Sequence, residues 1–155
     1  MGTVRVGMIG SGYMGRSYAE CLKRYCKGGR MTAVFGGSRA PKLAADYEAA
    51  HAASLEELLA RDDVDAVLVA SPHSAHREQV TRAAKAGKHV LVEKPMGLNT
   101  VECDAMIAAC REAGVVLSVI QTVRFRGTVA RAKRMIDEGR KACRKPSGSS
   151  SPHGG

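Results

Sequence analysis

Short apolar segments alternate with longer amphipathic segments along most of the chain. Five runs rich in Val, Ile or Leu have the length and composition of strands that are buried on both faces of a sheet. These runs are Val4–Ile9, Met31–Phe35, Ala66–Ala70, His89–Val92 and Val115–Ile120. The segments between and after them have helical spacing and cover Tyr13–Lys27, Pro41–Ala50, Leu55–Ala60, Ala75–Ala86, Thr100–Ala113 and Thr128–Glu138. This alternation predicts right-handed crossovers and an α/β fold with a doubly wound parallel sheet.

Residues typical of helix ends support these boundaries. Gly87 and Gly114 follow two of the predicted helices, where glycine readily adopts the left-handed backbone of a helix terminus. Ser54 stands three residues before Glu57, which is the spacing of a capping box. Thr100, two residues before Glu102, indicates a second helix start.

Length and composition favour one globular domain. The chain has 155 residues, of which 45% are hydrophobic, and its apolar runs are far shorter than the roughly 20 residues of a membrane span. The first run is also too short for a secretory signal. The five cysteines are odd in number and form no Cys-x-x-Cys pair. We therefore expect reduced thiols in a cytoplasmic protein, with no disulfide framework and no metal site.

The net charge of +9 is unevenly distributed. Residues 1–139 contain all fifteen acidic residues and carry +5, whereas residues 140–155 carry four basic residues and no acid. The basic residues of the body are scattered and the chain has only two Phe and no Trp, so nucleic-acid binding is disfavoured. The Ser/Gly-rich tail lacks apolar periodicity and is expected to be disordered.

A glycine-rich turn follows the first predicted strand. Gly10, Gly12 and Gly15 have the Gly-x-Gly-x-x-Gly spacing, in which the three glycines permit a tight turn, close approach of a pyrophosphate and close packing of helix on strand. The free N–H groups of the helix that begins here suit an anion. The sequence predicts a Rossmann dinucleotide-binding domain over residues 1–139, with cofactor contacts that include Ser11, Tyr13 and Met14. A purely structural turn is the alternative.

The end of the second predicted strand bears on the choice of cofactor. NAD-binding domains usually have Asp or Glu at this position, which binds the adenosine ribose. Here the segment is Phe-Gly-Gly-Ser-Arg, and Ser38 and Arg39 have the chemistry to bind a 2′-phosphate. NADP is therefore favoured, with NAD as the alternative and a solvated Arg39 as the competing interpretation.

Two later strand ends carry polar clusters. Ser71-Pro72-His73-Ser74-Ala75-His76 follows the third predicted strand, and Glu93-Lys94-Pro95 follows the fourth. Both clusters are expected at the same edge of the sheet as the glycine turn, because parallel strands end together. On this evidence alone, they are equally well explained as ordinary surface residues.

The glycine turn, the Ser-Pro-x-Ser-x-His cluster, the run Ala86–Pro95 and the pair Arg124-Phe125 together resemble the N-terminal domain of the Gfo/Idh/MocA oxidoreductases. That family includes glucose–fructose oxidoreductase and inositol dehydrogenase. The resemblance covers about residues 3–139 and implies activity on CH–OH groups of sugars, polyols or related carbonyl compounds.

The resemblance also implies roles for particular residues. Lys94 is expected beside the nicotinamide and the substrate, and this placement suits a general acid or base. Glu93 is assigned to the cofactor-binding residues, where it either orients the Lys94 ammonium or is only a carboxylate at the end of a strand. Cofactor contacts are implied for Ser71, Pro72 and His76, and Arg124 is expected near the nicotinamide end.

The family has a second α/β domain that forms the substrate wall, and we expect no counterpart to it within these 155 residues. Beyond Gly139 the family pattern gives way to the basic tail, as expected of a truncated or frameshifted product, with a basic regulatory tail as the alternative. Two functions therefore compete. One is an oxidoreductase domain, weakly active or inactive alone unless a second domain or subunit completes the substrate site. The other is a non-catalytic NAD(P)-binding or protein-interaction module.

Overall fold

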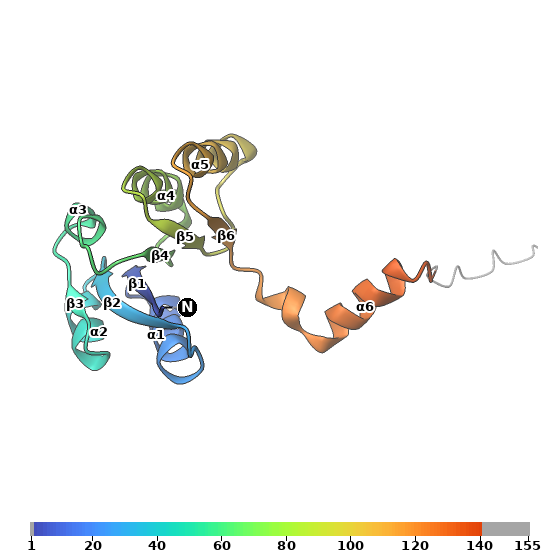
Figure 1. Ribbon diagram of the computed structural model, residues 1–155, viewed down its shortest axis with the longest axis horizontal. Coiled ribbons are helices and arrows are strands. Elements are labelled where there is room, and N and C mark those ends of the chain that lie inside the picture. Colours follow the sequence, from blue (N-terminus) through green and yellow to red (C-terminus); the bar gives the residue numbers. More distant parts are fainter. Residues whose placement is uncertain (1, 141–155) are drawn as a thin grey trace, which may run out of the picture. The chain divides into compact units, whose positions relative to one another are not determined.

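The computed structural model describes residues 2–140, which form two compact units divided between Ile120 and Gln121. The first unit contains a six-stranded, wholly parallel sheet with the order β3-β2-β1-β4-β5-β6 (Figure 1). Its strands are β1 (Val4–Ile9), β2 (Gly29–Phe35), β3 (Ala50–His51), β4 (Ala66–Val69), β5 (His89–Val92) and β6 (Leu117–Val119). The strand order reverses direction at β1, so the predicted doubly wound Rossmann sheet is confirmed.

Helices cover both faces of this sheet (Figure 1). One face is covered by α3 (Leu55–Leu59), α4 (His76–Lys85) and α5 (Thr100–Glu112), and the other by α1 (Tyr13–Arg24) and α2 (Ala40–Asp46). A short 3-10 helix, η1 (His73–Ala75), precedes α4.

Alternate residues of the strands point to opposite faces and form two apolar clusters. On the α3–α4–α5 face, Ile9, Val67 and Val92 are fully buried against those helices. On the α1–α2 face, Met8 and Val34 are fully buried against Ala19, Leu43 and other residues of α1 and α2. This burial on both sides is why the strands are apolar throughout.

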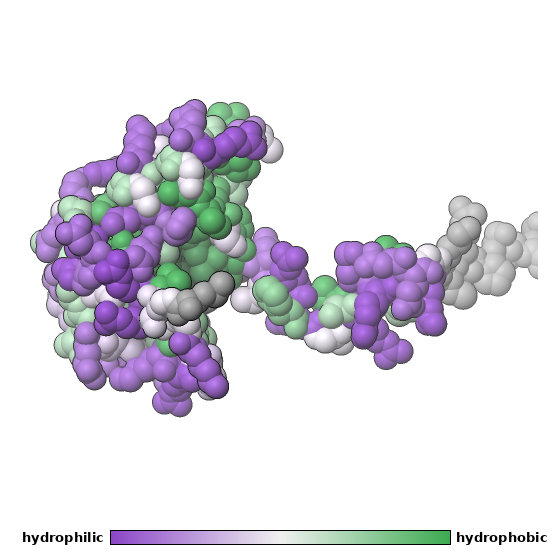
Figure 2. Space-filling model, in the orientation of Figure 1, coloured by the Kyte–Doolittle hydropathy of each residue, from purple (hydrophilic) through white to green (hydrophobic). Residues whose placement is uncertain are grey.

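The α1–α2 face is less completely covered towards β6. Figure 2 shows apolar surface gathered over the β5–β6 end of the sheet. There Leu91 and Ile120 are only partly buried, and Val116, just before β6, is 62% exposed.

Three main-chain segments approach one another closely at the start of α1. A Cβ atom on Gly15 would lie 2.1 Å from the carbonyl oxygen of Gly10, and one on Gly10 would lie 2.7 Å from that of Ala70. Gly10 also has a φ of 109°, a conformation that L side chains rarely adopt. Gly15 is thus required for the packing of α1 on β1, and Gly10 for the turn between them.

Several boundaries differ from the sequence-based prediction. The two-residue strand β3 lies where the second helix was expected to end, because α2 stops at Asp46 and Glu48 takes a positive φ of 54°. Gly87 and Gly114 have the predicted positive φ. Ser54 caps α3 through the Glu57 N–H, as predicted.

The helix α5 begins at Thr100, as predicted, but its capping residue is not the one that the sequence indicated. Its cap is Asn99, whose Oδ1 accepts from the Glu102 N–H at 2.9 Å, and Thr100 is already the first helical residue. The extended backbone of Asn99 places its side chain over the free N–H groups.

The second unit contains η2 (Thr122–Phe125) and the predicted last helix, α6 (Gly127–Asp137). Every described residue of this unit is exposed. The predicted disordered tail lies outside the described residues, apart from Arg140. Within residues 2–140, no helix is both long and apolar enough to cross a membrane.

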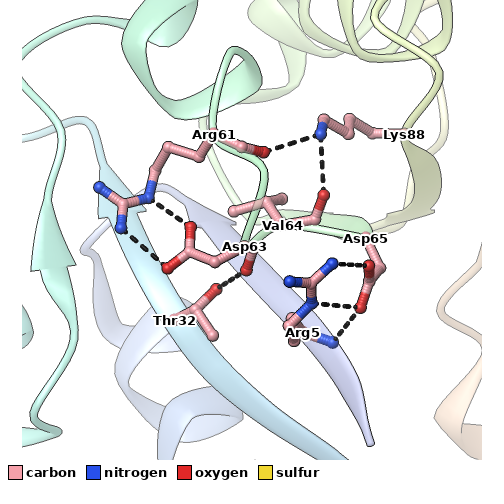
Figure 3. Close-up of polar contacts among 7 residues, drawn as sticks. All are labelled: Arg5, Thr32, Arg61, Asp63, Val64, Asp65 and Lys88. Carbon is pink, nitrogen blue, oxygen red and sulfur yellow. Dashed lines mark hydrogen bonds and ion pairs between the residues drawn. The ribbon is translucent and has the colours of Figure 1, made fainter. Parts of the chain in front are cut away.

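Ion pairs and hydrogen bonds connect the loop between α3 and β4 to neighbouring strands at the amino edge of the sheet, where the strands begin (Figure 3). Arg5 of β1 makes a bidentate pair with Asp65, which directly precedes β4, at 2.6 and 3.0 Å. The ammonium of Lys88 donates to the carbonyl oxygens of Arg61 and Val64, and Thr32 donates to that of Asp63. The α3–β4 loop is thereby tied to β1, to β2 and to the start of β5.

We expect Gly15→Ala to destabilise the first unit by about 3 kcal/mol, the upper end of the usual range for overpacking, because the methyl group would meet rigid main chain. Thermal unfolding followed by circular dichroism should show Tm lowered by about 10 °C. The control is Gly28→Ala, where a Cβ meets nothing within 4 Å. Equal Tm values for both variants would contradict the packing argument.

The Arg5–Asp65 pair predicts a pH dependence of stability. The hydrogen bonds from Arg5 lower the pKa of Asp65 well below its usual value. In the unfolded chain this carboxyl titrates near about 3.9, so the unfolded state takes up the proton first as pH falls. The free energy of unfolding should therefore decrease as pH drops below about 5. Denaturant unfolding at several pH values measures this free energy. The acid-induced decrease should be smaller for Asp65→Asn than for the unaltered chain. It should be the same as in the unaltered chain for Asp104→Asn, which changes an exposed carboxylate of α5.

Candidate dinucleotide-binding site

A pocket of about 590 Å³ opens at the carboxyl edge of the sheet, above the ends of β1, β2 and β4. Its position is the crevice beside the point where the strand order reverses, where ligands bind in open α/β sheets. Nine residues predicted to contact the cofactor line it: Gly10, Ser11, Gly12, Tyr13, Met14, Ser38, Arg39, Ser71 and Pro72.

The glycine turn and the start of α1 form one wall of this pocket. Gly12 is the N-cap of α1, and among the described residues no side chain caps this end and no acid lies in its first turn. The first N–H groups of the helix are therefore available to an anion. A Cβ on Gly12 would meet nothing within 4 Å, so its backbone faces open space. This arrangement fits a pyrophosphate.

The end of β2 forms the second wall. Gly36 and Gly37 both have positive φ, and the Ser11 N–H donates to the carbonyl oxygen of Gly36 at 3.1 Å. A Cβ on Gly37 would lie 2.7 Å from the hydroxyl oxygen of Ser11. The two glycines thus allow the β2 turn to lie against the glycine turn, with Ser38 and Arg39 exposed at the pocket.

The carboxylate nearest in sequence to Arg39 is engaged elsewhere. Asp46 pairs with Arg16 at 2.8 Å and with Lys42 at 3.0 Å, and these cations lower its pKa. Arg39 makes no ion pair with any residue in the described part of the chain. Its guanidinium therefore stays available to a ligand.

The end of β4 supplies the third wall, and one predicted residue lies behind it. The Ser71 hydroxyl donates to Oε1 of Gln79 at 2.5 Å, and both residues line the pocket. His76 is fully buried. Its Nε2 lies 3.1 Å from the carbonyl oxygen of Ser71, and its Nδ1 lies 3.1 Å from that of Pro95. This placement favours a positioning role for His76, holding the β4 and β5 loops together, over direct contact with a cofactor.

The end of β5 carries Glu93 and Lys94. Glu93 is 6% exposed; its carboxylate accepts from the Tyr18 hydroxyl and, at 2.6 Å, from the N–H of Lys94. Burial and this carboxylate raise the pKa of Tyr18 well above its usual value, so Tyr18 keeps its proton and stays a donor. The Lys94 side chain is exposed. Glu93 thus holds the main chain of Lys94 and makes no ion pair with its ammonium.

Two residues predicted to contact the cofactor remain. Gly15 is buried beneath the glycine turn. Arg124 belongs to η2 of the second unit, where its guanidinium lies over the Phe125 ring at 5.6 Å.

Sequence reasoning missed several residues of this region. Gln79 and Phe35 line the pocket, and Tyr18 binds Glu93. An aromatic or amide side chain inside an amphipathic helix carries no distinctive signal. The adjacent Gly36 and Gly37 after a strand were the one available indication of a special backbone.

The glycine turn, the uncapped start of α1 and the pocket beside the reversal of strand order define a dinucleotide-binding Rossmann domain. A family model described as an oxidoreductase family with an NAD-binding Rossmann fold matches residues 4–121. The chain belongs to this family, the Gfo/Idh/MocA oxidoreductases.

Proteins with similar sequences have names that indicate different substrates. The chain is 34% identical over 139 residues to 2,7-anhydro-N-acetylneuraminate hydratase from Mediterraneibacter gnavus, covering 90% of this chain and 37% of that protein. It is 41% identical over 117 residues to scyllo-inositol 2-dehydrogenase (NADP(+)) from Bacillus subtilis, covering 74% of this chain and 35% of the relative. The chain thus spans little more than a third of the length of these two relatives.

Solved structures contain the same fold. The WlbA dehydrogenase from Bordetella pertussis, in complex with NADH and UDP-GlcNAcA, superposes with a TM-score of 0.85 at 29% identity. The match covers 90% of this chain and 41% of that one. The comparisons therefore support an NAD(P)-binding domain, and relatives of this chain are named as using either NADH or NADP.

Proposed function

We propose that this chain binds NADP(H) in the carboxyl-edge pocket and serves as the cofactor domain of an oxidoreductase acting on CH–OH groups of sugars, polyols or related carbonyl compounds. The observation that carries the proposal is the open backbone of Gly12 at the uncapped start of α1. Family membership and the dehydrogenases among the relatives support the reaction type. A cytoplasmic location goes with it, supported by the four free cysteines of the described part.

The preference for NADP over NAD rests on charge. No carboxylate lines the pocket at the end of β2, where one would bind the ribose hydroxyls of NAD and repel a 2′-phosphate. Ser38 and Arg39 line that part of the pocket, and Asp46 is neutralised by Arg16 and Lys42. Arg39 supplies a permanently charged donor fork for a phosphate.

Lys94 is the proposed catalytic residue. The nicotinamide supplies or accepts the hydride when the cofactor is bound. With the adenosine half at β2 and the pyrophosphate at the glycine turn, the other half is directed towards β4 and β5, where Lys94 is exposed. Its side chain moves the proton of the reacting hydroxyl, and Glu93 holds its main chain in place.

The substrate is proposed to need further residues from a second domain or subunit. The pocket is lined by the residues expected for the cofactor, and the matched relatives are more than twice as long as this chain. Orientation of two reactants supplies several kcal/mol of a catalytic barrier. We therefore expect residues 1–155 alone to bind cofactor but to turn over substrate poorly.

We expect Gly12→Val to reduce NADPH affinity at least about 100-fold, because its branched side chain would occupy the space that a phosphate must enter. Isothermal titration calorimetry measures the affinity, and circular dichroism checks the fold. Gly28→Val is the matched control, since this glycine also faces open space but lies away from the pocket. Unchanged affinity in folded Gly12→Val would refute the site.

Arg39→Ala should weaken NADP binding by about ten- to a hundredfold and leave NAD nearly unaffected, because a charge-assisted contact is worth about 1.5–3 kcal/mol. The test measures dissociation constants for both cofactors in the same buffer. Arg30→Ala, an exposed arginine at the opposite end of β2, is the control. Equal losses for both cofactors would show that Arg39 does not bind the phosphate.

A further inference from the structure

The contact between Tyr18 and Glu93 joins two elements that are distant in sequence. Tyr18 lies on α1, the helix that begins at the glycine turn, and Glu93 directly follows β5. The hydroxyl of Tyr18 donates to Oε1 of Glu93, whose Oε2 accepts from the N–H of Lys94. These hydrogen bonds therefore link α1, whose first residues line the pocket, to the loop that carries Lys94.

Glu93 is a buried carboxylate held by neutral donors. It is 6% exposed and forms no ion pair with any cation in the described part of the chain. A buried carboxylate costs free energy unless hydrogen bonds compensate it, and here the two donors are a phenol and a main-chain N–H. Neither donor is a cation, so no group within hydrogen-bond distance neutralises this carboxylate at the end of β5.

This charge lies on the side of the sheet that the nicotinamide half of a cofactor would occupy. In the proposed site, the adenosine half lies at the β2 turn and the pyrophosphate at the glycine turn. The nicotinamide half then lies at the ends of β4 and β5. The oxidised nicotinamide ring carries a positive charge, and the reduced ring is neutral. A fixed negative charge near the ring therefore interacts differently with the two forms.

We propose that Glu93, held by Tyr18, makes this site discriminate between the two redox forms of the cofactor by stabilising the oxidised ring. The inference rests on the proposed cofactor site. Tyr18 is a positioning residue, because it acts through Glu93. A scaffolding role alone would change the affinity for both forms to the same extent, whereas a charge effect changes their ratio.

The test measures dissociation constants for NADP+ and NADPH with the 155-residue chain and three variants. Glu93→Gln keeps the shape of the side chain and removes its charge. The ratio of the NADP+ to the NADPH dissociation constant should rise by about tenfold, which is the size of the interaction of two unit charges roughly 10 Å apart at an effective dielectric constant of about 20.

Tyr18→Phe should raise this ratio in the same direction by a smaller factor, because the carboxylate that loses its donor turns towards water, which screens its charge. Tyr25→Phe is the matched control, since Tyr25 follows α1 and is 77% exposed. It should leave the ratio unchanged. Circular dichroism confirms that each variant folds, and Glu93→Gln alone decides the outcome should Tyr18→Phe unfold.

An unchanged ratio in folded Glu93→Gln, with both affinities lowered equally or not at all, would overturn the proposal. A ratio that rises in Tyr25→Phe as much as in Tyr18→Phe would overturn the role of Tyr18. Failure of the unaltered chain to bind either form would instead refute the proposed function, and that result precedes any comparison of variants.

Discussion

The close approach of Gly10, Gly15 and Ala70 is the constraint on which the rest of this structure depends. The helix α1 can lie on β1 only because Gly15 has no side chain to meet the carbonyl oxygen of Gly10, and β1 can lie beside the end of β4 only because Gly10 has none to meet that of Ala70. These contacts fix the direction of α1. The free N–H groups of α1 therefore point to the pocket. The pocket wall formed by the glycine turn and α1 is thus a result of main-chain packing.

The two edges of the sheet use polar groups in opposite ways. At the amino edge, Arg5, Lys88 and Thr32 are satisfied by partners within the fold, and their contacts stabilise it. At the carboxyl edge, the start of α1 and the Arg39 guanidinium have no such partner among the described residues. The polar side chains that stabilise the fold at the amino edge are therefore different from the polar groups that are available to a ligand at the carboxyl edge.

The sequence predicted most of this architecture because strands buried on both faces are apolar throughout and helices retain their period. It located the glycine turn from the Gly-x-Gly-x-x-Gly spacing, and it placed the ends of the neighbouring strands beside this turn because parallel strands end together. The cofactor contacts of Ser71 and Pro72 were expected only from the family resemblance. It failed where local pattern carries no information. The strand β3 has two residues and no apolar run. The start of α5 was predicted correctly, but Asn99 and Thr100 both suit a helix cap, and only the backbone conformation shows that Asn99 is the cap.

Tertiary context decides the roles of the remaining residues. His76 belongs to a polar cluster and the family resemblance implied a cofactor contact, but its side chain is fully buried and both ring nitrogens face main-chain oxygens. Tyr18 lies on α1 and is partly buried against the α1–α2 face of the sheet, and no sequence motif singled it out. Its contact with Glu93 spans 75 residues of sequence, and no local rule connects two residues so far apart.

The parallel pairing of β1 with β4 has a consequence for how the molecule is assembled. The strand β1 pairs on one side with β2 and on the other with β4, whose residues follow it by about 60 positions. A ribosome therefore releases the glycine turn long before Ala70, the main chain against which that turn packs, has been made. Contacts between residues so distant in sequence form slowly. The anion-binding end of α1 should therefore reach its native geometry only after residue 70 has been made and β4 has paired with β1.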